Sequence, residues 1–132
     1  MKFLLDTNIC IYIIKQKPGK VFKRFRKLAV GQVGISSITY SELYYGVAKS
    51  KAVSQNEAAL QQFVGPLDVI PYPEEAASIY GEIRAGLERQ GKSIGPLDTL
   101  IAAQARHQGL TLVSNNIKEF SRVPNLKVEN WV

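Results

Sequence analysis

Short apolar segments that alternate with longer helical segments constrain the fold of this chain most. The apolar segments cover residues 2–5, 33–36, 67–71 and 110–113. Buried strands separated by helices are typical of a parallel sheet that helices cover on both faces. The sequence therefore predicts an α/β fold, a three-layer α/β/α sandwich around a central, mostly parallel sheet. A length of 132 residues predicts one domain, residues 1–132.

Helix signals fill the gaps between these strands. Residues 8–15 have a periodicity that fits a helix or a strand, and the capping side chains of Asp6, Thr7 and Asn8 favour a helix there. Pro73 and Pro96 each open a further helix, and glycines at 91 and 109 mark where these two end. The remaining helices are expected over about 39–49 and 55–64.

Carboxylates stand where the predicted elements join. Asp6 follows the first strand, Glu42 and Asp98 lie in otherwise uncharged helical segments, and Glu119 follows a later strand. In parallel sheets, ligands bind beyond the carboxyl ends of the strands, where the strand order reverses. Carboxylates gathered at such an edge of a basic protein indicate a divalent-metal site that faces a polyanion.

Each of these acids also has a purely structural interpretation. Asp6 could cap the helix that follows it, and Glu42 could form a capping box with Thr39. Asp98 could be a first-turn acid that the helix dipole stabilises. Three caps would not be expected to share one edge of the sheet, so the metal site is the favoured interpretation.

The positive charge of the chain is concentrated in one segment. Of the net charge of +6, residues 15–27 contribute seven basic side chains and no acid, which leaves ten basic and eleven acidic residues elsewhere. Phe22 and Phe25 within this segment predict an amphipathic helix that anchors on the core and presents its cations outward. The predicted RNA-binding residues are Lys20, Lys23, Arg24 and Lys27. The alternative is an ordinary solvated helix face.

The single cysteine and the apolar segments indicate a reducing compartment. Cys10 has no partner for an internal disulfide and is expected in the core. The N-terminal apolar run ends at Asp6, so we expect no secretory signal. No apolar stretch approaches the ~20 residues that cross a bilayer, so no membrane partner is expected and a cytoplasmic location fits best.

Four segments of the chain, in order, resemble the motifs of PIN-domain nucleases. Taken singly each would be weak, but the ordered set is specific and covers the whole chain. The ending Arg122-Val123-Pro124-Asn125-Leu126 to Glu129-Asn130-Trp131 is similar to VapC-type toxins of bacterial toxin-antitoxin systems. The four motif segments are Leu4-Leu5-Asp6-Thr7-Asn8, Ser37 to Gly46, Gly95 to Ala102 and Leu112 to Phe120.

The resemblance implies an endoribonuclease that depends on Mg²⁺ or Mn²⁺ and hydrolyses structured RNA, with tRNA as the expected class. Asp6 and Asp98 would bind the metal, and Glu42 would be a further ligand or would hold a coordinated water. The catalytic set is then Asp6, Glu42, Asp98 and Glu119. Thr7, Asn8, Ser114 and Asn116 would orient or supplement these carboxylates.

One position departs from the family pattern. Many PIN nucleases carry an acid where this chain has Asn116, so Glu119 would have to supply the fourth carboxylate. Asn116 could still bind through its amide oxygen or through water. Without a negative charge at position 116, one bound metal ion is expected rather than two.

The resemblance also implies partners: a VapB-type antitoxin that inserts a segment into the acidic pocket, a homodimer, and a toxin-antitoxin hetero-oligomer. Phosphotransferases of the haloacid dehalogenase type also begin with a strand ending in Asp, but they need a second acid where this chain has Asn8. Response-regulator receivers need paired acids that are not evident here. The remaining alternative is a non-catalytic RNA-binding or interaction module on a PIN-like scaffold, which would leave the acids unexplained.

Overall fold

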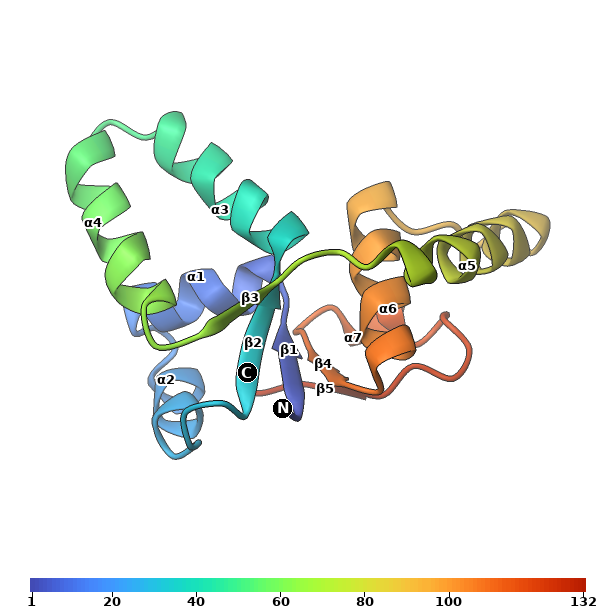
Figure 1. Ribbon diagram of the computed structural model, residues 1–132, viewed down its shortest axis with the longest axis horizontal. Helices are drawn as coiled ribbons and strands as arrows, with labels where there is room; N and C mark the ends of the chain where they lie inside the picture. Colours follow the sequence, from blue (N-terminus) through green and yellow to red (C-terminus); the bar gives the residue numbers. More distant parts are fainter.

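A single five-stranded parallel sheet forms the centre of the molecule (Figure 1). The computed structural model describes residues 1–132, and its strands run in the order β3-β2-β1-β4-β5 with every neighbouring pair parallel. The predicted α/β fold is confirmed, and the strand order reverses between β1 and β4, where a ligand is expected to bind. The strands are β1 (Phe3–Leu5), β2 (Val33–Ser36), β3 (Asp68–Ile70), β4 (Thr111–Val113) and β5 (Val128–Glu129).

Helices cover both faces of this sheet. Alternate residues of β1 face opposite ways, so Phe3 and Leu5 enter one apolar core while Leu4 enters the other. The first core is closed by α1 (Thr7–Lys15), α2 (Gly19–Arg26), α3 (Ser37–Ala48) and α4 (Val53–Val64). The second is closed by the 3₁₀ turn η1 (Glu74–Ala76) with α5 (Ala77–Arg89), by α6 (Pro96–Gln108) and by α7 (Ile117–Phe120). These two cores make the predicted three-layer sandwich.

The start of α1 agrees with the capping interpretation of Asp6, whereas the start of α3 differs from the expectation for Glu42. The Asp6 carboxylate caps α1 by accepting a hydrogen bond from the Ile9 N–H at 2.9 Å. Ser36 caps α3, which therefore begins at Ser37, and Thr39 lies buried inside the helix. The capping box between Thr39 and Glu42 is thus wrong, and capping does not explain Glu42.

Two boundaries and one strand were not predicted. The helix α4 begins two residues earlier than expected, and the segment after Pro73 makes one 3₁₀ turn before α5. β5 is only two residues long, too short for an alternating pattern, and it is identified only by its pairing with β4 at Val113 and Glu129. No helix is long and apolar enough to cross a membrane.

The basic helix α2 lies away from the starts of α1 and α3, and its Arg24 reaches Glu129 at the end of β5. In Figure 1 the starts of α1 and α3 lie at the upper middle of the molecule, whereas α2 lies at the lower left, beside the beginnings of the strands. Val21 is fully buried and Phe22 and Phe25 pack against the first core, so the predicted amphipathic helix is confirmed.

Candidate metal centre

Asp6 is the most buried acid of the chain, with 6% of its surface exposed. It follows β1 directly, and its backbone N–H donates to the Val113 carbonyl at the end of β4. Burial raises the pKa of the Asp6 carboxyl, and the nearby Glu42 carboxylate raises it further. Hydrogen bonds from the Ser114 hydroxyl and the Ile9 N–H act against that rise and favour the charged form. The fold thus holds a desolvated carboxylate at the reversal point of the sheet.

Glu42 is tied to the start of α1 by a hydrogen bond. The Thr7 hydroxyl donates to Glu42 Oε1 at 2.8 Å, across 35 positions of sequence. Because Thr7 is the first residue of α1 and Asp6 is its cap, this bond holds the Glu42 and Asp6 carboxylates on the same side of the sheet. This hydrogen bond supports the prediction that Thr7 orients Glu42.

Asp98 stands in the first turn of α6, two residues after Pro96. The pKa of its carboxyl is raised to about 6, first by burial and then by the charges of Glu119, Asp6 and Glu42. The first turn of a helix ordinarily stabilises a carboxylate, which acts in the opposite direction. The raised pKa therefore reflects burial together with three other acids within electrostatic range, and no cation compensates for them.

Glu119 on α7 is held by the loop that follows β4. The Asn116 side-chain amide donates to Glu119 Oε2 at 2.8 Å, and the buried Ser114 hydroxyl accepts from the Asn116 N–H at 2.9 Å. Asn116 therefore takes the position where many PIN nucleases have an acid, and it uses its amide to orient Glu119. Ser114 links this loop to Asp6, as its predicted orienting role requires.

The four carboxylates approach one another without closing into a cage. No three of the Asp, Glu, His or Cys side chains converge closely enough to enclose an ion in this arrangement. Like charges repel, and Glu42 and Glu119 each have a hydrogen-bond donor of their own. An all-oxygen set with an unneutralised buried carboxylate nevertheless fits a hard divalent cation such as Mg²⁺ or Mn²⁺.

The structure places two other side chains differently from the sequence expectation. Asn8 is exposed and forms no hydrogen bond with any of the four carboxylates. Asn115, which follows β4, instead donates to the Tyr12 hydroxyl at 3.0 Å and so connects its loop to α1. Sequence offered no sign of this contact, since 103 positions separate the two residues.

The basic side chains predicted to bind RNA do not border the carboxylates. Lys20 and Lys23 on α2 and Lys27 at its C-cap are exposed, and in Figure 1 this helix lies away from the starts of α1 and α3. Arg24 is partly neutralised because its guanidinium forms an ion pair with Glu129 at 2.6 Å and lies over the Trp131 ring. Arg24 therefore fastens the C-terminal segment to α2.

An apolar groove leads away from the carboxylates between α1, α3 and α4. Its volume is about 320 Å³, and Glu42 lies among its lining residues together with Ile11, Leu43 and Leu60. Lys15 lines the same groove at the end of α1. An amphipathic segment with apolar and basic side chains would complement this lining.

Known proteins match the chain over almost its full length. The PIN domain family matches residues 3–126. The tRNA(fMet)-specific endonuclease VapC of Shigella flexneri is 49% identical, with 99% of this chain and 98% of that protein covered. Ribonuclease VapC2 of Haemophilus influenzae is 48% identical, with 100% and 99% covered.

A solved structure agrees with the fold. VapBC2 from Rickettsia felis, bound to a DNA fragment from its promoter, has a chain that superposes with a TM-score of 0.93 and 44% identity, and all of both chains is covered. The order of the strands, the acids at their carboxyl ends and these full-length matches lead to one assignment. The chain belongs to the PIN-domain family, within its VapC group of ribonucleases.

Proposed function

We propose that the chain is a divalent-metal-dependent endoribonuclease that acts as the toxin of a toxin-antitoxin pair. The observation that carries the proposal is the gathering of four acids at one edge of the sheet, where burial first, and then the charges of the other three acids, raise the pKa of Asp98 to about 6. Such mutual repulsion is costly to the fold unless a cation is bound, so it indicates a site built for a cation.

The donor set assigns roles to the individual residues. Asp6 and Asp98 would hold Mg²⁺ or Mn²⁺ directly, and Glu42, oriented by Thr7, would be a further ligand or would hold a coordinated water. A cation bound there supplies charge neutralisation at the scissile phosphate and activates the attacking water. Glu119, oriented by Asn116, would supply the fourth carboxylate of the site.

The proposed substrate is structured RNA, with tRNA as the class. The relative from Shigella flexneri is named for tRNA(fMet) and is 49% identical to this chain. Recognition of a folded RNA depends mainly on shape and backbone contacts, which fits a chain of net charge +6. Products with a 5′-phosphate and a 3′-hydroxyl are expected.

A VapB-type antitoxin is the proposed partner of this chain in the cytoplasm. The groove between α1, α3 and α4 could accept an apolar segment of that partner, and Glu42 at the groove would attract a basic side chain. Neutralisation of the carboxylates by such a side chain would compete with metal binding. A homodimer of the chain within a toxin-antitoxin hetero-oligomer is also proposed.

The test is a cleavage assay with purified protein and an initiator tRNA transcript. Chelation of divalent ions should abolish cleavage, and Mg²⁺ or Mn²⁺ should restore it. Asp6→Asn and Asp98→Asn should each reduce the rate at least about 100-fold, because each removes a metal ligand without changing side-chain size. A control variant, Glu75→Gln, removes an exposed acid of η1 and should cleave at the parent rate.

A non-catalytic RNA-binding module makes the opposite prediction for the same variants. Such a module would bind the transcript without cutting it, and removal of Asp6 or Asp98 would leave its affinity unchanged or improve it. Cleavage at the parent rate by both variants would show that these carboxylates are not the metal site.

A further inference from the structure

Three lysines form one exposed row along α2. Lys20, Lys23 and Lys27 are separated by three and four positions, so they project from the same side of the helix over about 10 Å. The opposite side of the helix is occupied by Val21, Phe22 and Phe25, which contact the first core. We refer to Lys20, Lys23 and Lys27 as the α2 lysine row.

The fold does not account for this row. None of the three lysines forms an ion pair, since the only ion pair on α2 is that of Arg24 with Glu129. Lys20 lies in the first turn, where a cation opposes the helix dipole, and no acid balances it there. Lys23 and Lys27 repel each other at a spacing of four residues. Lys23 in the last turn and Lys27 at the C-cap are favoured by the dipole, so only Lys20 opposes it, and none of the three has a partner within the chain.

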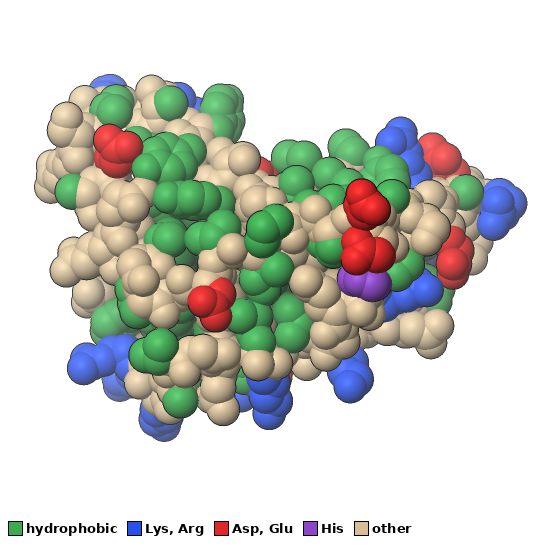
Figure 2. Space-filling view, in the orientation of Figure 1, with side chains coloured by type: hydrophobic (Ala, Val, Ile, Leu, Met, Phe, Trp, Pro, Cys, Tyr) green, Lys and Arg blue, Asp and Glu red, His purple; other side chains and the backbone are tan.

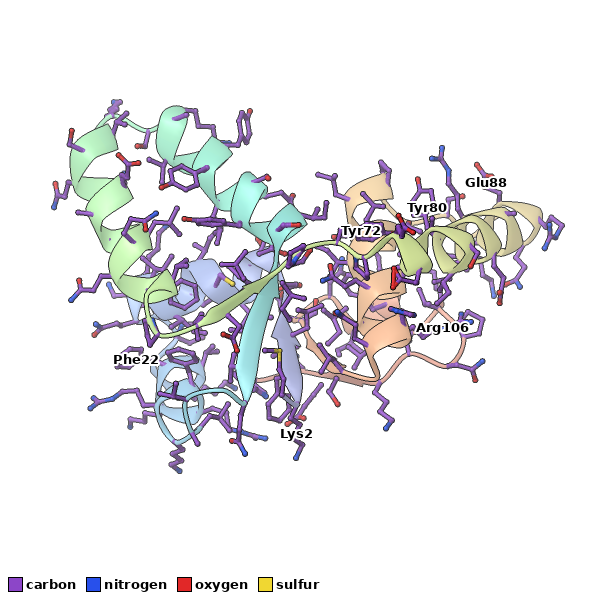
Figure 3. The ribbon with its side chains drawn as sticks, in the orientation of Figure 1. Lys2, Phe22, Tyr72, Tyr80, Glu88 and Arg106 are labelled. Atoms are coloured by element: carbon purple, nitrogen blue, oxygen red, sulfur yellow. The ribbon has the colours of Figure 1, made fainter.

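The row belongs to a basic border at the end of the molecule opposite the acids. Figure 2 shows Lys and Arg side chains along the lower edge of the molecule, and Figure 3 places Phe22 of α2 and Lys2, before β1, toward that edge. Asp6 caps the start of α1, and α2 follows the other end of α1. The helix α1, which links Asp6 to the segment before α2, has nine residues and is about 14 Å long.

We propose that the α2 lysine row is a second RNA-binding surface, which holds the backbone of a folded substrate while the scissile bond lies at the carboxylates. The inference rests on the proposed nuclease function and adds a size requirement for the substrate. Backbone charges of one strand are about 3.4 Å apart in a duplex, so an RNA strand as long as α1 covers about four nucleotides. A path over the protein surface is longer, and a very short RNA cannot reach both ends.

Such a surface contributes affinity without sequence preference. Lysines that contact phosphates bind as point charges, and each contact releases counterions. The apolar anchoring of α2 fixes the row relative to the sheet, so the spacing between the row and the carboxylates is constant. A substrate is then selected by whether its fold presents backbone at that spacing, which is selection by shape.

The test compares two triple variants that lose the same charge. In the first, Lys20, Lys23 and Lys27 become Gln. The control variant carries Lys51→Gln, Arg89→Gln and Lys92→Gln, exposed cations without ion pairs on other elements. Thermal melting and circular dichroism establish that both fold. Each is assayed with initiator tRNA and with a four-nucleotide RNA that spans the cleaved bond.

The α2 variant should raise KM for tRNA about 10- to 100-fold at 0.1 M salt with little change in kcat, and should leave cleavage of the short RNA unchanged. The slope of log KM against log salt should fall by about two for tRNA. The control variant should leave KM and kcat for both substrates unchanged. Equal losses in both variants would show a net-charge effect, and a loss with the short RNA would show that α2 acts on the site itself; either result would overturn the proposal.

Binding of tRNA to the two triple variants, each made in the Asp98→Asn background, separates this inference from the nuclease function. If only the α2 variant binds tRNA more weakly, the result supports the α2 lysine row as an RNA-binding surface, whether or not the parent protein cleaves. Absence of metal-dependent cleavage in the parent protein would refute the proposed function alone. Equal tRNA affinity of the α2 and control variants would mean that the row is a solvated helix face and would refute the inference.

Discussion

Asp98→Asn should make the metal-free protein more stable at neutral pH. The pKa of the Asp98 carboxyl rises from 3.8 to about 6 in the folded chain. Between these two values the folded chain binds more protons than the unfolded chain, so stability falls as the pH rises through this window. Above pH 6 the full penalty applies, and an uncharged Asn escapes it.

The size of the effect follows from the same pKa change. A difference of about two pKa units corresponds to about 3 kcal/mol as an upper value. Asp98 is only half-buried, and solvent screens its interactions with the other acids, so about 1 kcal/mol is expected. For a domain of this length that corresponds to an increase of about 3 °C in Tm.

Thermal melts with a chelator at pH 7.5 and pH 4.5 measure the difference in Tm between Asp98→Asn and the parent protein. Asp98→Asn should melt above the parent at pH 7.5, and the difference should shrink at pH 4.5, where the parent carboxyl is already protonated. Glu75→Gln, which removes an exposed acid, should show no such gain at either pH. A lower Tm for Asp98→Asn at pH 7.5 would refute the argument that the four acids repel one another.

Divalent metal should reverse the order of the melting temperatures of the parent protein and Asp98→Asn. At a concentration ten times its Kd, a bound ion stabilises the folded state by about 1.4 kcal/mol. The parent should therefore gain Tm with Mn²⁺ while Asp98→Asn gains little, because it lacks a ligand. An equal gain in both proteins would place the ion elsewhere.

Three further variants test individual contacts. Thr7→Ala should reduce kcat/KM about tenfold because it frees Glu42, while Thr7→Ser, which keeps the hydroxyl, should retain activity; equal loss in both would exclude the hydrogen bond as the cause. Asn116→Asp should tighten Mn²⁺ binding in calorimetry by adding a fifth carboxylate to the site, and unchanged affinity would place Asn116 outside it. Arg24→Gln should lower the free energy of unfolding by less than about 1 kcal/mol in denaturant unfolding, because it removes an exposed ion pair with Glu129. It should leave the salt dependence of RNA binding unchanged. A smaller slope of log affinity against log salt would show that Arg24 contacts RNA.

The layered fold was predictable because its signals are local. Each short apolar strand and each helix can be recognised from neighbouring residues, and their alternation follows along the chain. The boundaries of most elements follow from prolines, glycines and capping side chains. β5 was not predictable because two residues carry no period. The structure identifies it through pairing with β4, which is a contact between distant parts of the chain.

The candidate site was predictable in its acids and not in their contacts. The positions of Asp6 and Asp98 at element starts were visible in the sequence, and the edge of the sheet brings them together. The Glu42 interaction with Thr7 spans 35 positions, and that of Arg24 with Glu129 spans 105. Such contacts depend on the path of the whole chain, which explains why the sequence allowed a capping interpretation of Glu42 and did not indicate the ion pair of Arg24.

The direct test of the metal centre is a crystal of the protein soaked in Mn²⁺ and measured for anomalous scattering. The account predicts a peak between β1 and α6, with oxygens of Asp6 and Asp98 about 2.1 Å from it. Movement of the Asp98 carboxylate toward Asp6 should accompany binding, because the ion removes their repulsion. A peak away from these carboxylates, or none at Mn²⁺ concentrations that support cleavage, would contradict the central claim.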